Sequence, residues 1–149
     1  EYGRADLAVL EHELQRYSQR PLLIGSFSAA SNVTGMRTPV HEIAAMLHRY
    51  DAIACFDYAA SAPYVEIDMC PEAAKYEGDA SLDAVFISPH KFLGGPGATG
   101  VLVCVTCDGP DRHVFVEDVR RSPSSWQVFP SYLFLTTTCA GPMYTSFKM

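Results

Sequence analysis

Clustered positive charge and long apolar runs are both missing from this sequence, and each absence excludes a class of partner. The chain has 11 Lys and Arg residues against 17 Asp and Glu residues, which gives a formal net charge of −6. Because binding to nucleic-acid phosphates needs clustered Lys and Arg side chains, we expect no nucleic-acid partner. No apolar run reaches the roughly 18 to 20 residues that a membrane-spanning helix requires, so we expect no membrane partner.

The cysteine content is too low for a disulfide scaffold. Five cysteines occur among 149 residues, and an odd number at this density favours a reducing compartment. The start of the chain lacks the basic segment and apolar stretch of a secretory signal. We therefore predict a cytoplasmic protein. The chain also opens on Glu1 without an initiator Met, which indicates a fragment of a longer protein and leaves an organelle open.

What the sequence does contain is the composition of a globular protein and an alternation of helical and strand patterns. Apolar residues make up 48% and charged residues 19% of the chain, which is typical of a folded domain. Thr38 is the expected N-cap of the second helix, with Pro39 at its first helical position. Apolar spacing predicts helices over 5–19 and 40–49, and strands over 22–27, 52–56, 82–87 and 100–105.

Strands that are apolar throughout and alternate with helices indicate an α/β fold. We predict a mostly parallel sheet with flanking helices that cover both faces. Right-handed crossovers would then place the loops that follow the strands at one edge of the sheet. After Cys107 the periodicity weakens, and no element is predicted there. The chain is therefore divided into a domain over 1–106 and a divergent tail of uncertain structure over 107–149.

Three polar segments follow three of the predicted strands, at the edge where open α/β sheets bind their ligands. They are SNVTG over 31–35, DYAA over 57–60 and SPHK over 88–91. The last segment runs into FLGGPG over 92–97. This Gly-rich run precedes a strand instead of opening a helix, so it is not a dinucleotide-binding fingerprint.

The order of these segments resembles the class V aminotransferase and cysteine desulfurase superfamily. The resemblance rests on SNVTG, an Asp that ends an apolar strand, and S-x-H-K followed by FLGGPG, and it covers about 22–105. It implies that 1–106 is part of the large domain of a fold-type-I enzyme that uses pyridoxal 5'-phosphate (PLP). It also implies an amino-acid substrate and a homodimer, because in the family the cofactor lies at a dimer interface.

Lys91 is the residue that would hold the cofactor. PLP needs a lysine amine for its Schiff base, and a tight loop at a strand end can direct Lys91 into a cleft. Taken alone, a loop lysine is more often a solvated surface residue. Asp57 would keep the pyridine nitrogen protonated, which the cofactor needs to act as an electron sink. The alternative for Asp57 is a turn or a helix cap.

The other site residues are assigned by the same resemblance. Ser88 and His90 resemble residues that contact the cofactor phosphate, and the alternatives are a loop cap and an exposed histidine. Asn32 matches the asparagine that approaches the phenolic oxygen of PLP and the substrate, although it could equally be structural. Where many desulfurases carry Gln, this chain has Ala60, with Ser61 one residue further on. This departure weakens the desulfurase interpretation and leaves the PLP interpretation intact.

Two other functions stay open at this point. Cys104 and Cys107 have C-x-x-C spacing and His113 follows, which suggests a zinc-binding module, but no second pair of ligands occurs at a related spacing. The other function is that of a non-catalytic or truncated remnant, because the resemblance fades after about Val105. Within the PLP interpretation, the sequence does not decide between transamination, desulfuration and another lyase step.

Overall fold

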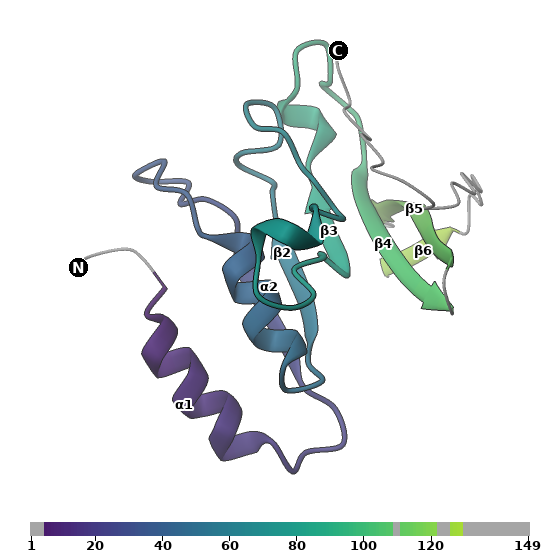
Figure 1. Cartoon of the computed structure of the whole chain (residues 1–149). Coiled ribbons are helices and arrows are strands. Elements are labelled where there is room, and N and C mark those ends of the chain that lie inside the picture. Colours follow the sequence, from purple (N-terminus) through teal and green to yellow (C-terminus); the bar gives the residue numbers. More distant parts are fainter. Residues whose placement is uncertain (1–4, 109–110, 122–125, 130–149) are drawn as a thin grey trace.

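The computed structural model describes residues 5–108, 111–121 and 126–129. These residues form one sheet with two α-helices packed near it (Figure 1). In chain order the elements are α1 (Leu7–Tyr17), β1 (Ile24–Ser28), α2 (Val40–His48), β2 (Ile53–Asp57), η1 (Ala73–Lys75), β3 (Ala84–Ile87), η2 (Pro89–Lys91), β4 (Gly100–Asp108), β5 (Asp111–Arg121) and β6 (Trp126–Phe129), where η marks a short 3₁₀ turn.

The sheet is mixed, and its strands follow one another in sequence order from β1 to β6. β1, β2 and β3 run parallel, whereas β4, β5 and β6 are joined antiparallel to the preceding strand. The connection from β1 to β2 contains α2, while that from β3 to β4 contains only η2 and a Gly-rich loop. The predicted α/β class is confirmed, and the carboxyl ends of the three parallel strands meet at one edge.

The predicted strand over 100–105 is confirmed as part of β4, whereas β5 and β6 lie where the sequence predicted no element. β4 extends to Asp108, and every residue of β4 pairs with a residue of β5. β6 then pairs with the end of β5. β4 runs across the predicted division between 106 and 107. The division of the chain into a domain and a tail stays a prediction. Residues 130–149 of the predicted tail lie outside the described residues.

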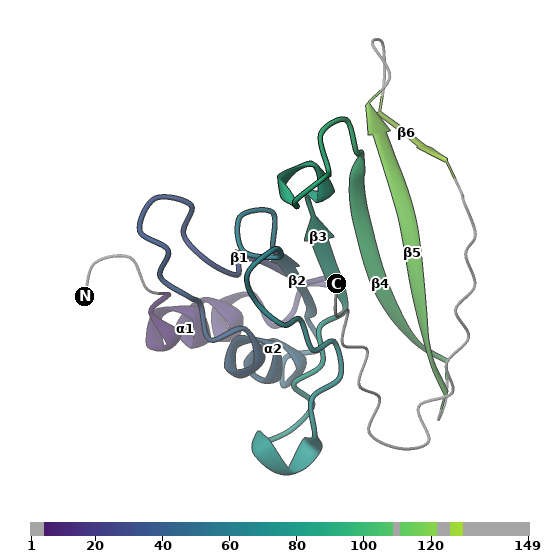
Figure 2. The same ribbon diagram turned by 90° about the horizontal axis from the view of Figure 1, so that it is seen from above.

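One face of the parallel strands is buried against helix α2. Seen from above, α1 and α2 lie on the same side of β1–β3 (Figure 2). On that face of β2, Ala54 and Phe56 are fully buried. Helix α2 also contacts β1 so closely that a Cβ atom added to Gly25 of β1 would lie 2.5 Å from both Cδ atoms of Leu47 in the helix. A small residue in β1 therefore permits the helix to pack directly on the strand.

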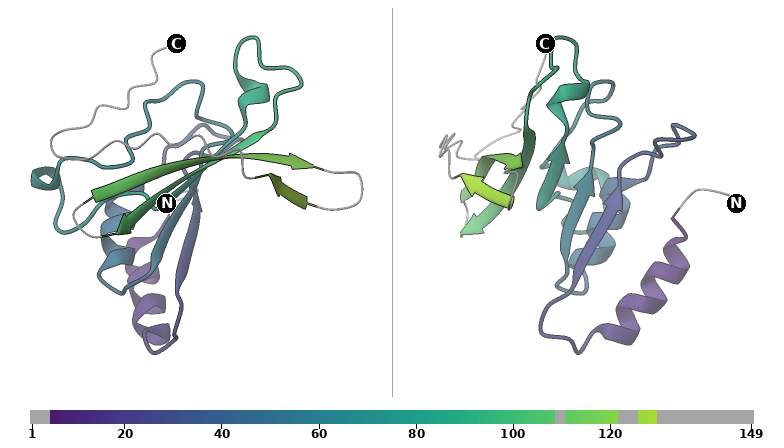
Figure 3. Two further views of the ribbon diagram at one scale, coloured as in Figure 1. Left: turned by 90° about the vertical axis from the view of Figure 1, so that its right-hand side faces the viewer. Right: turned by 180° about the vertical axis from the view of Figure 1, so that it is seen from behind.

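The opposite face of the same strands is exposed at several positions, although Ala84 on that face of β3 is buried. Side chains alternate along a strand, so Ile53 faces away from the side on which Phe56 is buried. Register pairs Ile24 with Ile53, and these side chains are 58% and 39% exposed. Phe86 in β3 is 42% exposed and pairs with Asp57. In the left view of Figure 3 both α-helices lie on one side of β1–β3, so within the described part the predicted helices cover one face and not both.

The prediction that Thr38 caps α2 is wrong. The residue before the helix is Pro39, and it makes no side-chain cap hydrogen bond. The Thr38 hydroxyl instead donates to the carbonyl of Ser28 at 2.6 Å, and the Thr38 N–H donates to Ala29 O at 2.9 Å. The hydroxyl therefore ties the end of the β1 loop back to the end of β1.

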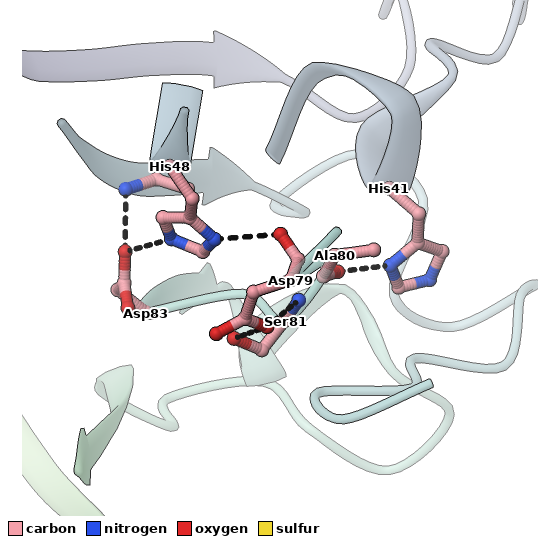
Figure 4. Close-up of polar contacts among 7 residues, drawn as sticks. His41, His48, Asp79, Ala80, Ser81 and Asp83 are labelled. Atoms are coloured by element: carbon pink, nitrogen blue, oxygen red, sulfur yellow. Dashed lines mark hydrogen bonds and ion pairs between the residues drawn. The ribbon is translucent and has the colours of Figure 1, made fainter. Parts of the chain in front are cut away.

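A cluster of polar groups joins α2 to β2 and β3 at the amino ends of the strands (Figure 4). The two ring nitrogens of His48 lie 2.9 Å from Asp83 Oδ2 and 2.8 Å from the carbonyl of Asp79. Asp83 Oδ2 also accepts from the Ala54 N–H at 2.6 Å. Because both ring nitrogens face acceptors, the geometry favours the doubly protonated imidazolium. The hydrogen bond to Asp83 accordingly raises the pKa of His48, although burial acts in the opposite direction.

Candidate active site

The three polar segments begin side by side at the carboxyl edge of the parallel strands. The Ala29 N–H, just past β1, donates to Asp57 O at the end of β2 at 2.9 Å. The Tyr58 N–H, just past β2, donates to Phe86 O in β3 at 2.8 Å. All three connections rise from the same edge of the sheet, at the top of Figure 1. The prediction that the loops share one edge is confirmed.

Lys91 ends a tight turn that starts directly after β3. Its N–H donates to Ser88 O at 3.0 Å, and the next N–H, of Phe92, donates to Pro89 O at 2.9 Å. The Lys91 side chain is exposed. Ser88 makes no side-chain cap hydrogen bond, so the loop-cap alternative for its hydroxyl finds no support in the described residues. The turn therefore fixes the Lys91 backbone and leaves the amine accessible.

Gly95 closes this turn from the other side. Its N–H donates to Phe92 O at 2.9 Å, and a Cβ atom at this position would collide with the carbonyl oxygen of Pro89. A carbonyl oxygen is rigid backbone, so the neighbour cannot rotate away as a flexible side chain would. The Gly-rich run thus acts by letting the chain fold back over the turn that carries Lys91.

Asp57 is the last residue of β2, and its side chain is exposed on the open face of the sheet. Its Oδ1 atom accepts a hydrogen bond from the Ala59 N–H at 2.7 Å. This is the turn role that was the alternative for Asp57. One carboxylate oxygen suffices for it, and Oδ2 has no hydrogen-bond partner among the described residues. The turn contact orients the carboxylate, and the second oxygen stays available to a ligand.

Asn32 lies near the tip of the β1 loop. The loop is closed by an isolated bridge between Ala30 and Arg37 and by hydrogen bonds to Ser31. The carboxamide of Asn32 is exposed, and no described residue bonds to it. His90 is likewise exposed, beside Lys91 in η2. These side chains are accessible at the edge where Asp57 and Lys91 lie.

Two further residues of the loop after β2 are buried beside the edge: Tyr58, which the sequence did not single out as a site neighbour, and Ser61, which follows the position of the missing Gln. Tyr58 is 5% exposed, and burial raises the pKa of its hydroxyl to about 12, against the opposing effect of the Arg37 charge. Ser61 is 7% exposed, and its Oγ atom is buried with no partner among the described residues. Ser61 therefore does not present its hydroxyl at the exposed edge in place of the Gln that Ala60 replaces.

The structure brings the five predicted site residues to one edge but does not pair their side chains. Ser88 and Lys91 are linked through the backbone of η2; no other hydrogen bond joins two of the five among the described residues. The chemistry of the set nevertheless fits PLP. If PLP is bound here, Lys91 would supply an amine for the aldehyde, Asp57 a carboxylate for the ring nitrogen, and Ser88 and His90 polar groups for the phosphate. Within the described part there is no cluster of three or more potential metal-ligating side chains.

Comparison with known families decides the membership of the chain. The family profile described as Aminotransferase class-V matches residues 1–107. The chain belongs to this family. The match covers all four strands that the sequence predicted and all three site loops. The predicted resemblance is therefore confirmed.

Part of the chain is also similar to a curated relative. The chain is 40% identical over 72 residues to a probable cysteine desulfurase of Halalkalibacterium halodurans, an alignment that covers 48% of this chain and 16% of the relative. The chain therefore matches only a small part of the length of that protein. No solved structure matches the chain. None of the described helices is both long enough and apolar enough to cross a membrane.

Proposed function

We propose that this chain is the cofactor-binding part of a PLP-dependent enzyme that acts on an amino acid, with Lys91 as the residue that forms the Schiff base. The observation that carries the proposal is the meeting of three loops at the carboxyl edge of β1–β3. Each loop brings an accessible group of the required kind: a carboxamide, a carboxylate and an amine. Ligands bind at this edge in open α/β sheets, and membership of the Aminotransferase class-V family supports the same cofactor.

Each residue has a distinct task in this proposal. PLP supplies an electron sink that stabilises negative charge next to the amino-acid nitrogen. Asp57 holds a proton on the ring nitrogen through its free Oδ2 atom, while the bond from Ala59 to Oδ1 keeps the carboxylate oriented. Ser88 and His90 hold the phosphate, and Asn32 donates from its carboxamide to the phenolic oxygen. Lys91 would hold the cofactor covalently through its amine, and the same amine, when free, would be the group placed to move a proton at the amino-acid α-carbon.

The proposal leaves the reaction open among three outcomes: transamination, desulfuration, or another lyase step. The printed name of the Halalkalibacterium halodurans relative, a probable cysteine desulfurase, supports desulfuration. The presence of Ala60 where many desulfurases carry Gln argues against it. A homodimer, a cytoplasmic location and a small amino-acid substrate, with no nucleic acid and no membrane as partners, complete the proposal.

The alternative of a truncated, non-catalytic remnant is favoured by one observation. Asn32, Asp57, His90 and Lys91 are all exposed to solvent in the chain as described. PLP enzymes control their reaction by excluding water from the site, and nothing in the described residues closes over this one. We therefore propose that the 149-residue chain by itself holds the cofactor weakly and does not turn over an amino acid.

Borohydride reduction tests the assignment of Lys91. The PLP-loaded chain is reduced and digested, and we expect a pyridoxyl adduct on the peptide that contains Lys91. Lys91→Ala should abolish both that adduct and the visible absorbance of the bound cofactor. Lys75→Ala is the matched control, because Lys75 is also exposed in a short 3₁₀ turn, η1, but in a different connection. An adduct on Lys75 that survives in Lys91→Ala would show that the site is elsewhere.

A further inference from the structure

We propose that Ser31 is a positioning residue that holds the β1 loop in the shape that presents Asn32 to the cofactor. The proposal rests on the proposed function, since it assigns Asn32 a ligand contact. Ser31 itself does not touch the ligand in this proposal. Its hydroxyl acts only through the backbone on which Asn32 is carried.

The Ser31 hydroxyl is the centre of the turn. Its Oγ atom accepts from the Val33 N–H at 3.2 Å and from the Thr34 N–H at 3.1 Å. These two N–H groups directly follow Asn32 in the chain. The backbone of Ser31 is also engaged: its N–H donates to Met36 O and its carbonyl accepts from the Gly35 N–H, both at 2.9 Å. One residue therefore makes four of the contacts that shape the loop around Asn32.

The other two hydroxyls of the loop also bond to backbone groups. Thr34 Oγ1 accepts from the Met36 N–H at 3.3 Å, and the Thr38 hydroxyl donates to Ser28 O. Gly35 takes a positive φ of 71°, which lets the chain turn back. In contrast to these hydroxyls, the carboxamide of Asn32 has no partner among the described residues. A loop whose hydroxyls hold its own backbone while one carboxamide points to solvent is suited to present that carboxamide.

Removing the Ser31 hydroxyl should loosen the loop without unfolding the domain. The loop is exposed, so water can hydrogen-bond the released N–H groups of Val33 and Thr34 and the cost to folding is small. What is lost is the fixed direction of Asn32. Binding of a ligand must then order the loop, and the entropy cost of that ordering lowers the affinity.

A double-mutant cycle in the full 149-residue chain separates this role from a merely structural one. The variants are Ser31→Ala, Asn32→Ala, both together, and Ser31→Thr, which keeps a hydroxyl. The matched control is Ser26→Ala, because Ser26 is an exposed serine of β1 whose side chain makes no hydrogen bond in the described part. Two properties are measured: the dissociation constant for PLP, and the hydrogen-exchange rates of the Val33 and Thr34 amides without PLP.

Ser31→Ala should raise both exchange rates and weaken PLP binding by about three- to tenfold, the range of one exposed hydrogen bond. Ser31→Thr should restore both properties, and Ser26→Ala should change neither. In the Asn32→Ala background, Ser31→Ala should still accelerate exchange but should not weaken PLP binding further, because the group it positions is gone.

Additive losses of PLP affinity in the double variant would overturn the proposal, as would an unchanged affinity in Ser31→Ala. The failure of the proposed function itself has a different signature. If borohydride traps no adduct on Lys91 in the unaltered chain, the cofactor assignment falls, and the role of Ser31 falls with it.

Discussion

The two edges of the parallel strands differ in how many of their polar side chains are left without a hydrogen-bond partner. At the amino edge, His48 and Asp83 bond to each other, and Asp83 also bonds to the start of β2. At the carboxyl edge, the side chains of Asn32, His90 and Lys91 are exposed, and none has a hydrogen-bond partner among the described residues. Paired groups stabilise a fold, whereas accessible unpaired groups are available to a ligand. The comparison therefore separates the residues that build this domain from those that we assign to its chemistry.

The sharpest test of this separation is the charge of Asp57. Asp57→Asn keeps an oxygen that can accept from the Ala59 N–H but removes the negative charge. In PLP labelled with ¹⁵N and bound to the chain, we expect the ring nitrogen to become about 10-fold or more harder to protonate, because a neighbouring opposite charge shifts a pKa by about one unit or more. The ¹⁵N chemical shift, followed against pH, measures this.

Asp57→Ala is the companion variant, since it removes both the turn contact and the charge. The two variants should agree in the ¹⁵N titration and should leave thermal unfolding nearly unchanged. If instead the ring keeps its protonation in Asp57→Asn, the turn is the whole role of Asp57 and the carboxyl edge is not arranged as proposed.

Asp83 at the amino edge should respond in the opposite way. Asp83→Ala removes the acceptor for His48 Nε2 at 2.9 Å and for the Ala54 N–H at 2.6 Å. We expect the free energy of unfolding to fall by about 1 to 3 kcal/mol, because a half-buried donor loses its charged acceptor. Denaturant titration checks this value, and PLP affinity at 25 °C should stay within about twofold of that of the unaltered chain.

Asp68→Ala provides the matched control, because Asp68 is exposed and its one hydrogen bond among the described residues is a local one, accepted from the Cys70 N–H. It should change neither property appreciably. A large loss of PLP affinity in Asp83→Ala, with stability intact, would mean that the two edges are coupled and that the contrast between them is false.

The smallest expected effect is a pH dependence of stability at the amino edge. The pKa of His48 is raised from its usual 6.5, first by its hydrogen bond to Asp83, with burial opposing. A group whose pKa is higher in the folded state stabilises most where it is protonated in both states. The contribution is therefore complete below pH 6.5 and is lost as the pH rises through the raised value.

His48→Gln removes the titration, so the comparison of the two proteins isolates it. The groups that face the His48 ring are the Asp83 carboxylate and the carbonyl of Asp79, whose carboxylate adds a weaker attraction. We expect the difference in unfolding free energy between the two proteins to be larger at pH 6 than at pH 9. A difference that grows toward pH 9 would show that His48 is neutral in the folded state.

The sequence predicted the parts of the fold that follow from local pattern. β1, β2 and β3 are short apolar runs, and their predicted bounds differ from the observed ones by two residues or fewer. β5 was missed because its sequence, DRHVFVEDVRR, mixes charged and apolar residues without a continuous apolar run. Its pairing is set by the antiparallel return of the chain beside β4, which no local pattern carries.

The candidate site was predictable in its position and not in its details. Topology alone places the ends of parallel strands at one edge, so the sequence could locate Asp57 and Lys91 there. The contacts of individual hydroxyls could not be read in this way. Thr38 has the residue type and position of a helix cap but bonds to Ser28, 10 residues earlier. His48 and Asp83 are 35 residues apart, and only the folded chain makes them neighbours.

The position of Gly95 has a consequence for which mutations this protein can accept. Any other side chain there would have to displace the Pro89 carbonyl, which begins the turn that ends at Lys91. A substitution with no chemistry of its own would thus redirect the amine from four residues away. Among random variants selected for a trapped Lys91 adduct, Gly95 should tolerate replacement as poorly as a reacting residue does. Screens of that kind would then rank a backbone-shaping glycine beside the lysine, although only the lysine forms a bond.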